Sequence, residues 1–207
     1  MTTSVEPRQP RFLLASASPR RAALLRAAGF SFDVLPADVD ECARPGEAAA
    51  AYVLRVARDK AAAVLVHAGD RTVIAADTVV VVDDQVLGKP TDEADAARML
   101  RLLSGRRHDV LTAVVMERAG QPARTHVERT TVEFEALNEA EVAAYIASGE
   151  PMDKAGGYGV QGLASRFVRH IEGSYTSVVG LPVARVYAML EPPESAGWPI
   201  GSAPFGD

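Results

Sequence analysis

The sequence has very little cysteine, since Cys42 is the only one among 207 residues. A single cysteine excludes an intrachain disulfide and a zinc site built from several thiolates, so we predict a protein of the reducing cytoplasm. A nucleophilic role for this thiol has little support, because its neighbours are Glu41, Ala43 and Arg44 and no histidine lies near it in the sequence.

Long apolar runs are also missing, and aromatic residues make up only 6% of the chain. No run approaches the length of a membrane span, and residues 1–11 are polar, which argues against a signal peptide or a membrane anchor. The net charge of −5 argues against a general electrostatic grip on nucleic acid or on an anionic membrane. We therefore expect neither nucleic acid nor a membrane as a partner, and basic residues that act only locally.

What the sequence does have is an ordinary globular composition, with 48% hydrophobic and 24% charged residues. Its length allows one domain or two tightly joined lobes, and the chain has no internal repeat and no linker. We predict a flexible N-terminus over residues 1–10, one folded domain over 11–190, and a flexible C-terminal tail over 191–207, which is rich in helix breakers.

Apolar runs bounded by turn signals alternate with helical patterns, which is typical of an α/β fold. The expected strands cover residues 12–15, 32–35, 73–82, 109–117 and 123–134, and the expected helices cover 19–28, 47–67, 91–103, 138–148 and 182–190. The β-branched run over 73–82 predicts a central strand, which Asp83 and Asp84 turn into a hairpin. Thr91 is expected to cap one helix, and Asn138 with Glu141 predicts a capping box at another.

The most informative segment is residues 16–21, Ser-Ala-Ser-Pro-Arg-Arg, between an apolar run and a helical stretch. Pro19 suits the first helical position, so the free N–H groups and the positive end of the helix dipole point at a turn of small hydroxyl residues. Arg20 and Arg21 oppose that dipole, which makes sense where a bound phosphate offsets the cost. On local physics alone, a Ser-capped helix with solvated arginines fits equally well.

Asp77 places an ionisable carboxylate within an apolar strand, where burial without a partner costs several kcal/mol. A metal ion or a lysine would neutralise that charge, and strand ends are where α/β proteins place catalytic groups. The alternative is that Asp77 turns into a solvated loop.

Three weaker signals accompany this carboxylate. Lys89 projects from a loop stiffened by Pro90, which is not a Walker A loop because Asp83 stands where that motif needs a glycine. The acidic residues 38–41 suit Mg²⁺ as well as they suit a solvated turn. Lys60 lies in an alanine-rich helical stretch that can pack closely against another element.

Residues 153–162, Asp-Lys-Ala-Gly-Gly-Tyr-Gly-Val-Gln-Gly, formally contain the pattern G-x-G-x-x-G. A Rossmann site for NAD is rejected, because these glycines do not follow an apolar strand and no acidic residue lies about twenty residues further on. A flexible loop that shapes a base or phosphate pocket fits better. The four histidines lack metal-ligand spacing and no G-x-S-x-G elbow is present, so a hydrolase triad is not expected.

Taken together, these segments resemble the Maf family of nucleoside triphosphate pyrophosphatases over about residues 12–190. The resemblance is carried by residues 16–21, Asp40-Glu41, Lys60, 76–78, 88–90, Ser104-Gly105 with His108, and 153–162. It implies an α/β fold with an elongated mixed sheet in two lobes around a central cleft, similar to inosine triphosphate pyrophosphatases. It also implies a homodimer and metal-dependent cleavage of the α–β phosphoanhydride, which releases a nucleoside monophosphate and pyrophosphate.

The resemblance implies roles for single residues as well. Asp77 would be the general base that activates water, and Glu41 with Asp77 would hold Mg²⁺ or Mn²⁺. A carboxylate among cations stays ionised and suits metal binding at least as well as proton abstraction. The triphosphate would be held by Ser16, Arg20, Arg21, Lys60 and Lys89.

Arg20, Thr78 and Gln161 match the branch of the family that resembles dTTP and UTP pyrophosphatases, whereas the branch acting on 7-methyl-GTP has Trp, Gln and Glu there. A Gln amide can pair with the carbonyl and N–H edge of a pyrimidine. Gly157 departs from many relatives, which carry Ala or Ser, and extra loop freedom there would loosen base selectivity. The alternative function is that of a regulatory nucleotide-binding protein in cell division or septum formation.

Overall fold

The computed structural model describes residues 11–190, so the predicted flexible ends, 1–10 and 191–207, lie outside the described residues. The strands are β1 (Phe12–Leu14), β2 (Phe32–Val34), β3 (Thr72–Val82), β4 (Gln85–Leu87), β5 (Arg107–Glu117), β6 (Arg124–Phe134) and β7 (Val168–Glu172). The helices are α1 (Pro19–Ala27), α2 (Ala49–Leu65), α3 (Glu93–Leu103), α4 (Glu139–Ala147), α5 (Tyr175–Val179) and α6 (Val183–Ala188). Three short 3₁₀ turns separate α4 from β7: η1 (Glu150–Asp153), η2 (Ala155–Gly157) and η3 (Leu163–Phe167).

The strands form one mixed sheet in the order β2-β1-β3-β5-β6-β7, and β4 pairs with the end of β3. The strands β1, β2 and β3 are parallel, whereas the pairs from β3 through β7 are antiparallel. The predicted α/β class with a mixed sheet is therefore confirmed. In this part of the chain, no helix has both the length and the apolar character needed to cross a membrane.

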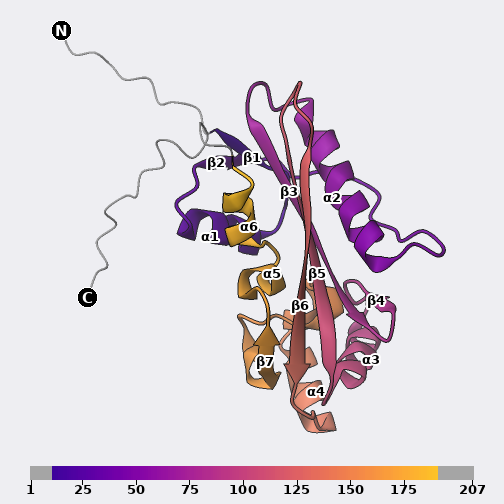
Figure 1. The fold of residues 1–207 in the computed structure, drawn as a ribbon. Coiled ribbons are helices and arrows are strands. Elements are labelled where there is room, and N and C mark those ends of the chain that lie inside the picture. Colours follow the sequence, from indigo (N-terminus) through magenta and orange to yellow (C-terminus); the bar gives the residue numbers. More distant parts are fainter. Residues whose placement is uncertain (1–10, 191–207) are drawn as a thin grey trace, which may run out of the picture.

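The long strand β3 runs through the middle of the sheet, and it is mostly buried because it is apolar on both faces. It continues with β5 and β6 along the length of the molecule, so that β1, β2, α1 and α6 gather at one end and α3, α4 and β7 at the other (Figure 1). Asp83 and Asp84 both have positive φ, 48° and 61°, which is the backbone of a two-residue hairpin turn. The prediction of a central strand followed by a hairpin is confirmed.

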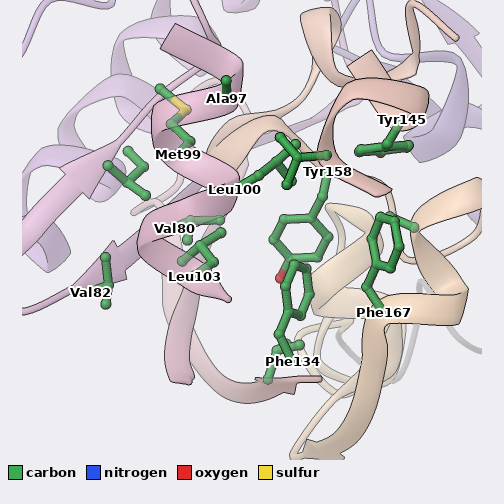
Figure 2. Close-up of a cluster of buried hydrophobic side chains, with 14 of the residues drawn as sticks. Val80, Val82, Ala97, Met99, Leu100, Leu103, Phe134, Tyr145, Tyr158 and Phe167 are labelled. Atoms are coloured by element: carbon green, nitrogen blue, oxygen red, sulfur yellow. The ribbon is translucent and has the colours of Figure 1, made fainter. Parts of the chain in front are cut away.

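The core divides into three clusters that follow this arrangement. One lies between the sheet and α2, and a second lies under α1 and α6. The third joins α3 and α4 to the far end of the sheet, where Phe134, Tyr158 and Phe167 face the aliphatic side chains of α3 (Figure 2). The segment over 154–162 is thus anchored at the far end by a buried tyrosine.

The helix starts follow local capping chemistry. The capping box at Asn138 and Glu141 is present as predicted. The predicted cap at Thr91 is wrong, because Asp92 takes that position: its backbone is extended and its carboxylate accepts a hydrogen bond from the N–H of Asp95 at 2.7 Å. Sequence patterns also missed β7 and α5, which are five residues each and too short to show a period of hydrophobic residues.

His108 is buried at the boundary between β5 and the 3₁₀ segment. Its ring packs edge-on against Phe134 and Tyr158, and Nε2 lies 2.8 Å from the Tyr158 hydroxyl. Its Nδ1 is buried without a hydrogen-bond partner among the described residues. Burial disfavours the charged ring and lowers the pKa of His108 from 6.5 to about 4.

The stability of the fold is therefore expected to decrease as the pH falls from 6.5 towards 4, because the unfolded chain binds a proton on His108 there and the folded chain does not. Between pH 7.5 and 5 this group destabilises the fold by about 2 kcal/mol. His108→Gln should reduce the pH dependence of the free energy of unfolding in urea by that amount. The exposed His67→Gln should leave it unchanged, and equal effects of the two variants would contradict this account.

Candidate active site

A cavity of about 580 Å³ opens between the two ends of the molecule. Its walls come from the first turn of α1, the loop before α2, the middle of α2 and β3, the loop after β4, the 3₁₀ segment and the end of α5. All nine residues predicted for the site line it: Ser16, Arg20, Arg21, Glu41, Lys60, Asp77, Thr78, Lys89 and Gln161. The structure thus brings together side chains that are far apart in the sequence, from Ser16 to Gln161.

The turn before α1 has the form expected of an anion-binding turn. Pro19 is the first helical residue, and Ser18 is the N-cap whose hydroxyl accepts a hydrogen bond from the N–H of Arg21. The Ser16 hydroxyl accepts a hydrogen bond from the N–H of Ser18 at 3.1 Å. The first turn of α1 contains no acidic residue, so its N–H groups and the helix dipole favour an anion in the cavity.

Arg21 ties this turn to the rest of the site. Its Nε donates to the Gly180 carbonyl at 2.7 Å, while its two Nη atoms donate to the hydroxyls of Ser16 and Thr78 at 3.3 and 3.2 Å. A guanidinium has five N–H donors, so two of them are left for a ligand. Burial lowers the pKa of Arg21, and the negative charges of Asp77 and Glu41 oppose that change.

Asp77 and Lys60 form a buried ion pair where α2 packs on β3. The Nζ of Lys60 lies 2.8 Å from Asp77 Oδ1 and 2.8 Å from Glu41 Oε1. Asp77 and Lys60 are each 7% exposed, because the small Ala57 and Ala61 let the helix approach the strand closely. The charge of Asp77 is neutralised by a lysine, and the alternative of a solvated loop is wrong.

Glu41 stands on the open side of this pair, with 46% of its side chain exposed. Its partial burial would raise the pKa of the carboxyl, but the hydrogen bond and the charge of Lys60 outweigh this and lower it. The loop that carries Glu41 is held by α2: the Tyr52 hydroxyl donates to the Glu41 carbonyl at 2.8 Å, and Arg55 donates to the Cys42 carbonyl at 2.9 Å. Sequence reasoning missed both residues, although Tyr52 lies eight positions before Lys60 and hence on the same helix face.

Lys89 is exposed in the loop after β4 and makes no ion pair within residues 11–190. The preceding Gly88 carbonyl accepts a hydrogen bond from the N–H of Gly156 at 2.9 Å, which joins this loop to the 3₁₀ segment. The Lys89 ammonium is therefore available to a ligand in the cavity.

Arg20 reaches from α1 to the opposite wall of the cavity. Its Nη1 lies 2.7 Å from Asp153 Oδ2, and its Nη2 donates to the Asp153 carbonyl at 3.4 Å. Partial burial would raise the pKa of Asp153, but hydrogen bonds from Lys154 and Arg20 outweigh it and lower the pKa to about 2. This pair stays ionised throughout the neutral range.

The other two residues predicted to set specificity differ in their surroundings. The Thr78 hydroxyl accepts from Arg21 and lies 3.0 Å from the hydroxyl of Thr112, which donates to the Ser177 carbonyl at 2.8 Å. Thr78 is therefore engaged with protein groups and orients Arg21. Gln161 is exposed between η2 and η3, where its amide faces no such network.

The two adjacent glycines of the 3₁₀ segment are buried and both have φ of +69°. A Cβ at Gly157 would lie 3.3 Å from Pro90 Cγ, and one at Gly156 would lie 2.7 Å from Val80 Cγ2 and 2.9 Å from Val80 Cβ. Close approach of the backbone to β3 therefore requires a glycine at position 156.

Gly156→Ala is expected to destabilise the fold by about 3 kcal/mol, from left-handed backbone strain together with overlap against Val80. Gly120 provides the matched control, because it has φ of +74° and a Cβ added there would have nothing within 4 Å. Gly120→Ala should cost only about 1 kcal/mol, since backbone strain acts alone there. Urea unfolding of both variants measures the difference, and equal losses would refute the steric argument.

The residues present fit a divalent cation that shares its coordination with a ligand. Asp77 and Glu41 offer carboxylate oxygens, and Mg²⁺ is commonly held by one or two carboxylates, with substrate phosphates and water completing the set. Residues 11–190 contain no group of three or more His, Cys, Asp or Glu arranged for a metal. With Asp77 and Glu41 as protein ligands, the ion would take its remaining ligands from phosphate oxygens and water.

Comparison with known proteins gives matches over nearly the whole chain. A family model described as Maf-like protein matches residues 11–192. A protein of Koribacter versatilis named dTTP/UTP pyrophosphatase is 52% identical over 179 residues, which cover 86% of this chain and 92% of that protein. A protein of Anaeromyxobacter dehalogenans with the same name is 48% identical over 194 residues, which cover 92% of this chain and 96% of that protein.

Among solved structures, a nucleoside-triphosphatase or dITP/XTP pyrophosphatase from Mycobacterium abscessus is 16% identical, covers 59% of this chain and 72% of its own, and has a TM-score of 0.37.

Proposed function

Because this chain belongs to the Maf family, we propose that it is a nucleoside triphosphate pyrophosphatase that hydrolyses dTTP and UTP. The observation that carries the proposal is that several cationic side chains, the two carboxylates of Asp77 and Glu41, and an exposed amide line one cavity. Water and the triphosphate give the nucleoside monophosphate and pyrophosphate. Removal of non-standard pyrimidine nucleotides is a role that such an activity would serve.

The triphosphate binds where positive charge and N–H donors converge. The turn over residues 16–21 offers backbone N–H groups, and Arg21 offers the two donors that its protein contacts leave free. Lys89 lines the cavity from the loop after β4, and Arg20 extends across the cavity from α1. Phosphoryl transfer needs mainly such positioning and charge neutralisation, because little covalent help is required of the protein.

Asp77 is the group that acts on water. Lys60 donates to its Oδ1, and Oδ2 receives no hydrogen bond from the described residues, so the second oxygen can face a water molecule. The neighbouring ammonium, 2.8 Å from Oδ1, holds the carboxylate in one orientation. Asp77 then accepts a proton from the water that attacks the α-phosphorus, and pyrophosphate leaves.

Mg²⁺ or Mn²⁺ is the proposed cofactor, and Asp77 and Glu41 would hold it. When bound, the ion would neutralise charge on the phosphate oxygens. The contribution of Lys60 is to hold both carboxylates in place, oriented toward the cavity.

Base recognition is assigned to Gln161, with Arg20 and Thr78 in support. The Gln161 amide both donates and accepts, so it can pair with the carbonyl and N–H edge shared by uracil and thymine. Thr78 acts through Arg21, and Arg20 is held across the cavity by Asp153.

A hydrolysis panel tests this proposal. The purified chain with Mg²⁺ or Mn²⁺ is given dTTP, UTP, dATP, GTP and 7-methyl-GTP, and the products are separated by ion exchange. We expect kcat/KM for dTTP and UTP to exceed the others by at least about tenfold. A preference for 7-methyl-GTP would overturn the assignment, and tight binding without turnover of any triphosphate would favour the regulatory alternative.

The proposed state is a cytoplasmic homodimer. The location is supported by the exposed free thiol of Cys42, and the dimer is supported by the family resemblance alone. Light scattering on the full chain tests the dimer, because a mass equal to one chain would contradict it.

A further inference from the structure

We propose that Glu150 is a positioning residue that fixes the segment Tyr158 to Gly162 and thereby sets the base selectivity of the cavity. This inference rests on the proposed pyrophosphatase function. Glu150 does not itself line the cavity, whereas all five residues from Tyr158 to Gly162 do. Its side chain therefore acts on a ligand only through the segment that carries Gln161.

One carboxylate holds both ends of that segment. The N–H of Leu163, just after it, donates to Glu150 Oε2 at 2.8 Å. At the other end the N–H of Gly159 donates to the Tyr145 hydroxyl at 3.2 Å, and this hydroxyl donates to Glu150 Oε1 at 2.9 Å. Gln161 sits between these two anchors, so the position of its backbone depends on Glu150.

Two glycines of the segment lie close against side chains of the preceding turn. A Cβ at Gly162 would overlap the carboxylate of Glu150, and a Cβ at Gly159 would lie 2.6 Å from Lys154 Cε. The backbone therefore wraps tightly around two side chains of the preceding turn. This wrapping accounts for the last two glycines of the formal G-x-G-x-x-G pattern, and the close approach of Pro90 accounts for the first, Gly157.

The same turn, η1, also holds the second proposed specificity residue. The Glu150 carbonyl accepts from Lys154 Nζ at 2.7 Å, and this ammonium lies 2.6 Å from Asp153 Oδ1. Asp153 in turn pairs with Arg20. The turn thus fixes Gln161 from one side and Arg20 from the other, whereas none of these contacts reaches the Ser16 hydroxyl or the pair of Lys60 and Asp77.

The test compares Glu150→Ala with wild type in the full chain. The readouts are the ratio of kcat/KM for dTTP to that for dATP and the inhibition constant of inorganic tripolyphosphate, which lacks a base. We expect the ratio to fall by about tenfold or more, because an unfixed amide no longer discriminates, while the tripolyphosphate constant stays within about threefold. Glu139→Ala, a surface carboxylate on α4 paired with Arg101, is the matched control and should change neither.

Two further variants keep the inference falsifiable if Glu150→Ala folds poorly. Glu150→Gln retains the size of the side chain and one acceptor, so it should recover most of the selectivity that Glu150→Ala loses. Tyr145→Phe removes only the bridging hydroxyl, and it should lower the ratio of kcat/KM for dTTP to that for dATP, as Glu150→Ala does. An unchanged ratio in Glu150→Ala and Tyr145→Phe would overturn the inference, as would a parallel loss of tripolyphosphate affinity. If wild type hydrolyses no triphosphate, the proposed function fails, and the ratio of dissociation constants for dTTP and dATP tests Glu150 independently.

Discussion

Asp77→Asn is expected to lower kcat for dTTP by about 10³-fold, because the variant keeps the shape of the side chain but cannot accept a proton from water or hold a cation as a carboxylate does. The amide oxygen can still accept the hydrogen bond from Lys60, and Glu41 still faces that ammonium, so the site keeps its architecture. Steady-state kinetics gives kcat, and calorimetry with dTTP should give a dissociation constant within about tenfold of wild type.

Asp59→Asn is the control for this variant. It is the same substitution, made one position before Lys60, at an aspartate whose side chain is 45% exposed. Its kcat should stay close to that of wild type. Turnover by Asp77→Asn at the wild-type rate would remove Asp77 from the reaction and would defeat the proposed mechanism.

Lys60→Met should destabilise the fold by about 3 kcal/mol, because it leaves the buried carboxylate of Asp77 without its cation. The loss arises at Asp77, which is 7% exposed, and less at Glu41, whose carboxylate reaches solvent. Urea unfolding measures the effect. Lys89→Met makes the same change at an exposed lysine and should shift the free energy of unfolding by no more than about 0.5 kcal/mol.

The double variant Lys60→Met, Asp77→Asn distinguishes the contribution of the ion pair to stability from that of side-chain packing. With both charges removed, we expect it to be about 2 kcal/mol more stable than Lys60→Met alone, because no unpaired charge stays buried. If the losses in the free energy of unfolding of the two single variants simply add up in the double variant, the ion pair does not stabilise the fold in the way the geometry indicates.

The sequence predicted those parts of the fold that depend on local chemistry. The central strand β3 follows from its β-branched run, and the hairpin at Asp83 and Asp84 and the capping box at Asn138 follow from residues that are neighbours in the chain. A cation opposite Asp77 was expected from the free-energy cost of burying its carboxylate, since that cost applies to any carboxylate within a buried strand.

The same reasoning could not predict contacts that join distant segments. The residues near Arg21 in the sequence do not indicate that three of its five N–H donors will bind Ser16, Thr78 and Gly180. Likewise, the residues near Glu150 do not indicate that its carboxylate will accept hydrogen bonds from Tyr145 and Leu163. Such partners are decided by the tertiary fold. The patterns found residues that line the cavity, and the structure adds those that hold them in place.

The central claim is that water attacks the α-phosphorus of a pyrimidine triphosphate. Hydrolysis of dTTP in water labelled with the heavy oxygen isotope, followed by mass spectrometry of both products, tests it most directly. The account predicts thymidine monophosphate carrying the label and unlabelled pyrophosphate, with neither product formed by Asp77→Asn at an appreciable rate. Label in pyrophosphate, or release of orthophosphate with thymidine diphosphate, would contradict it.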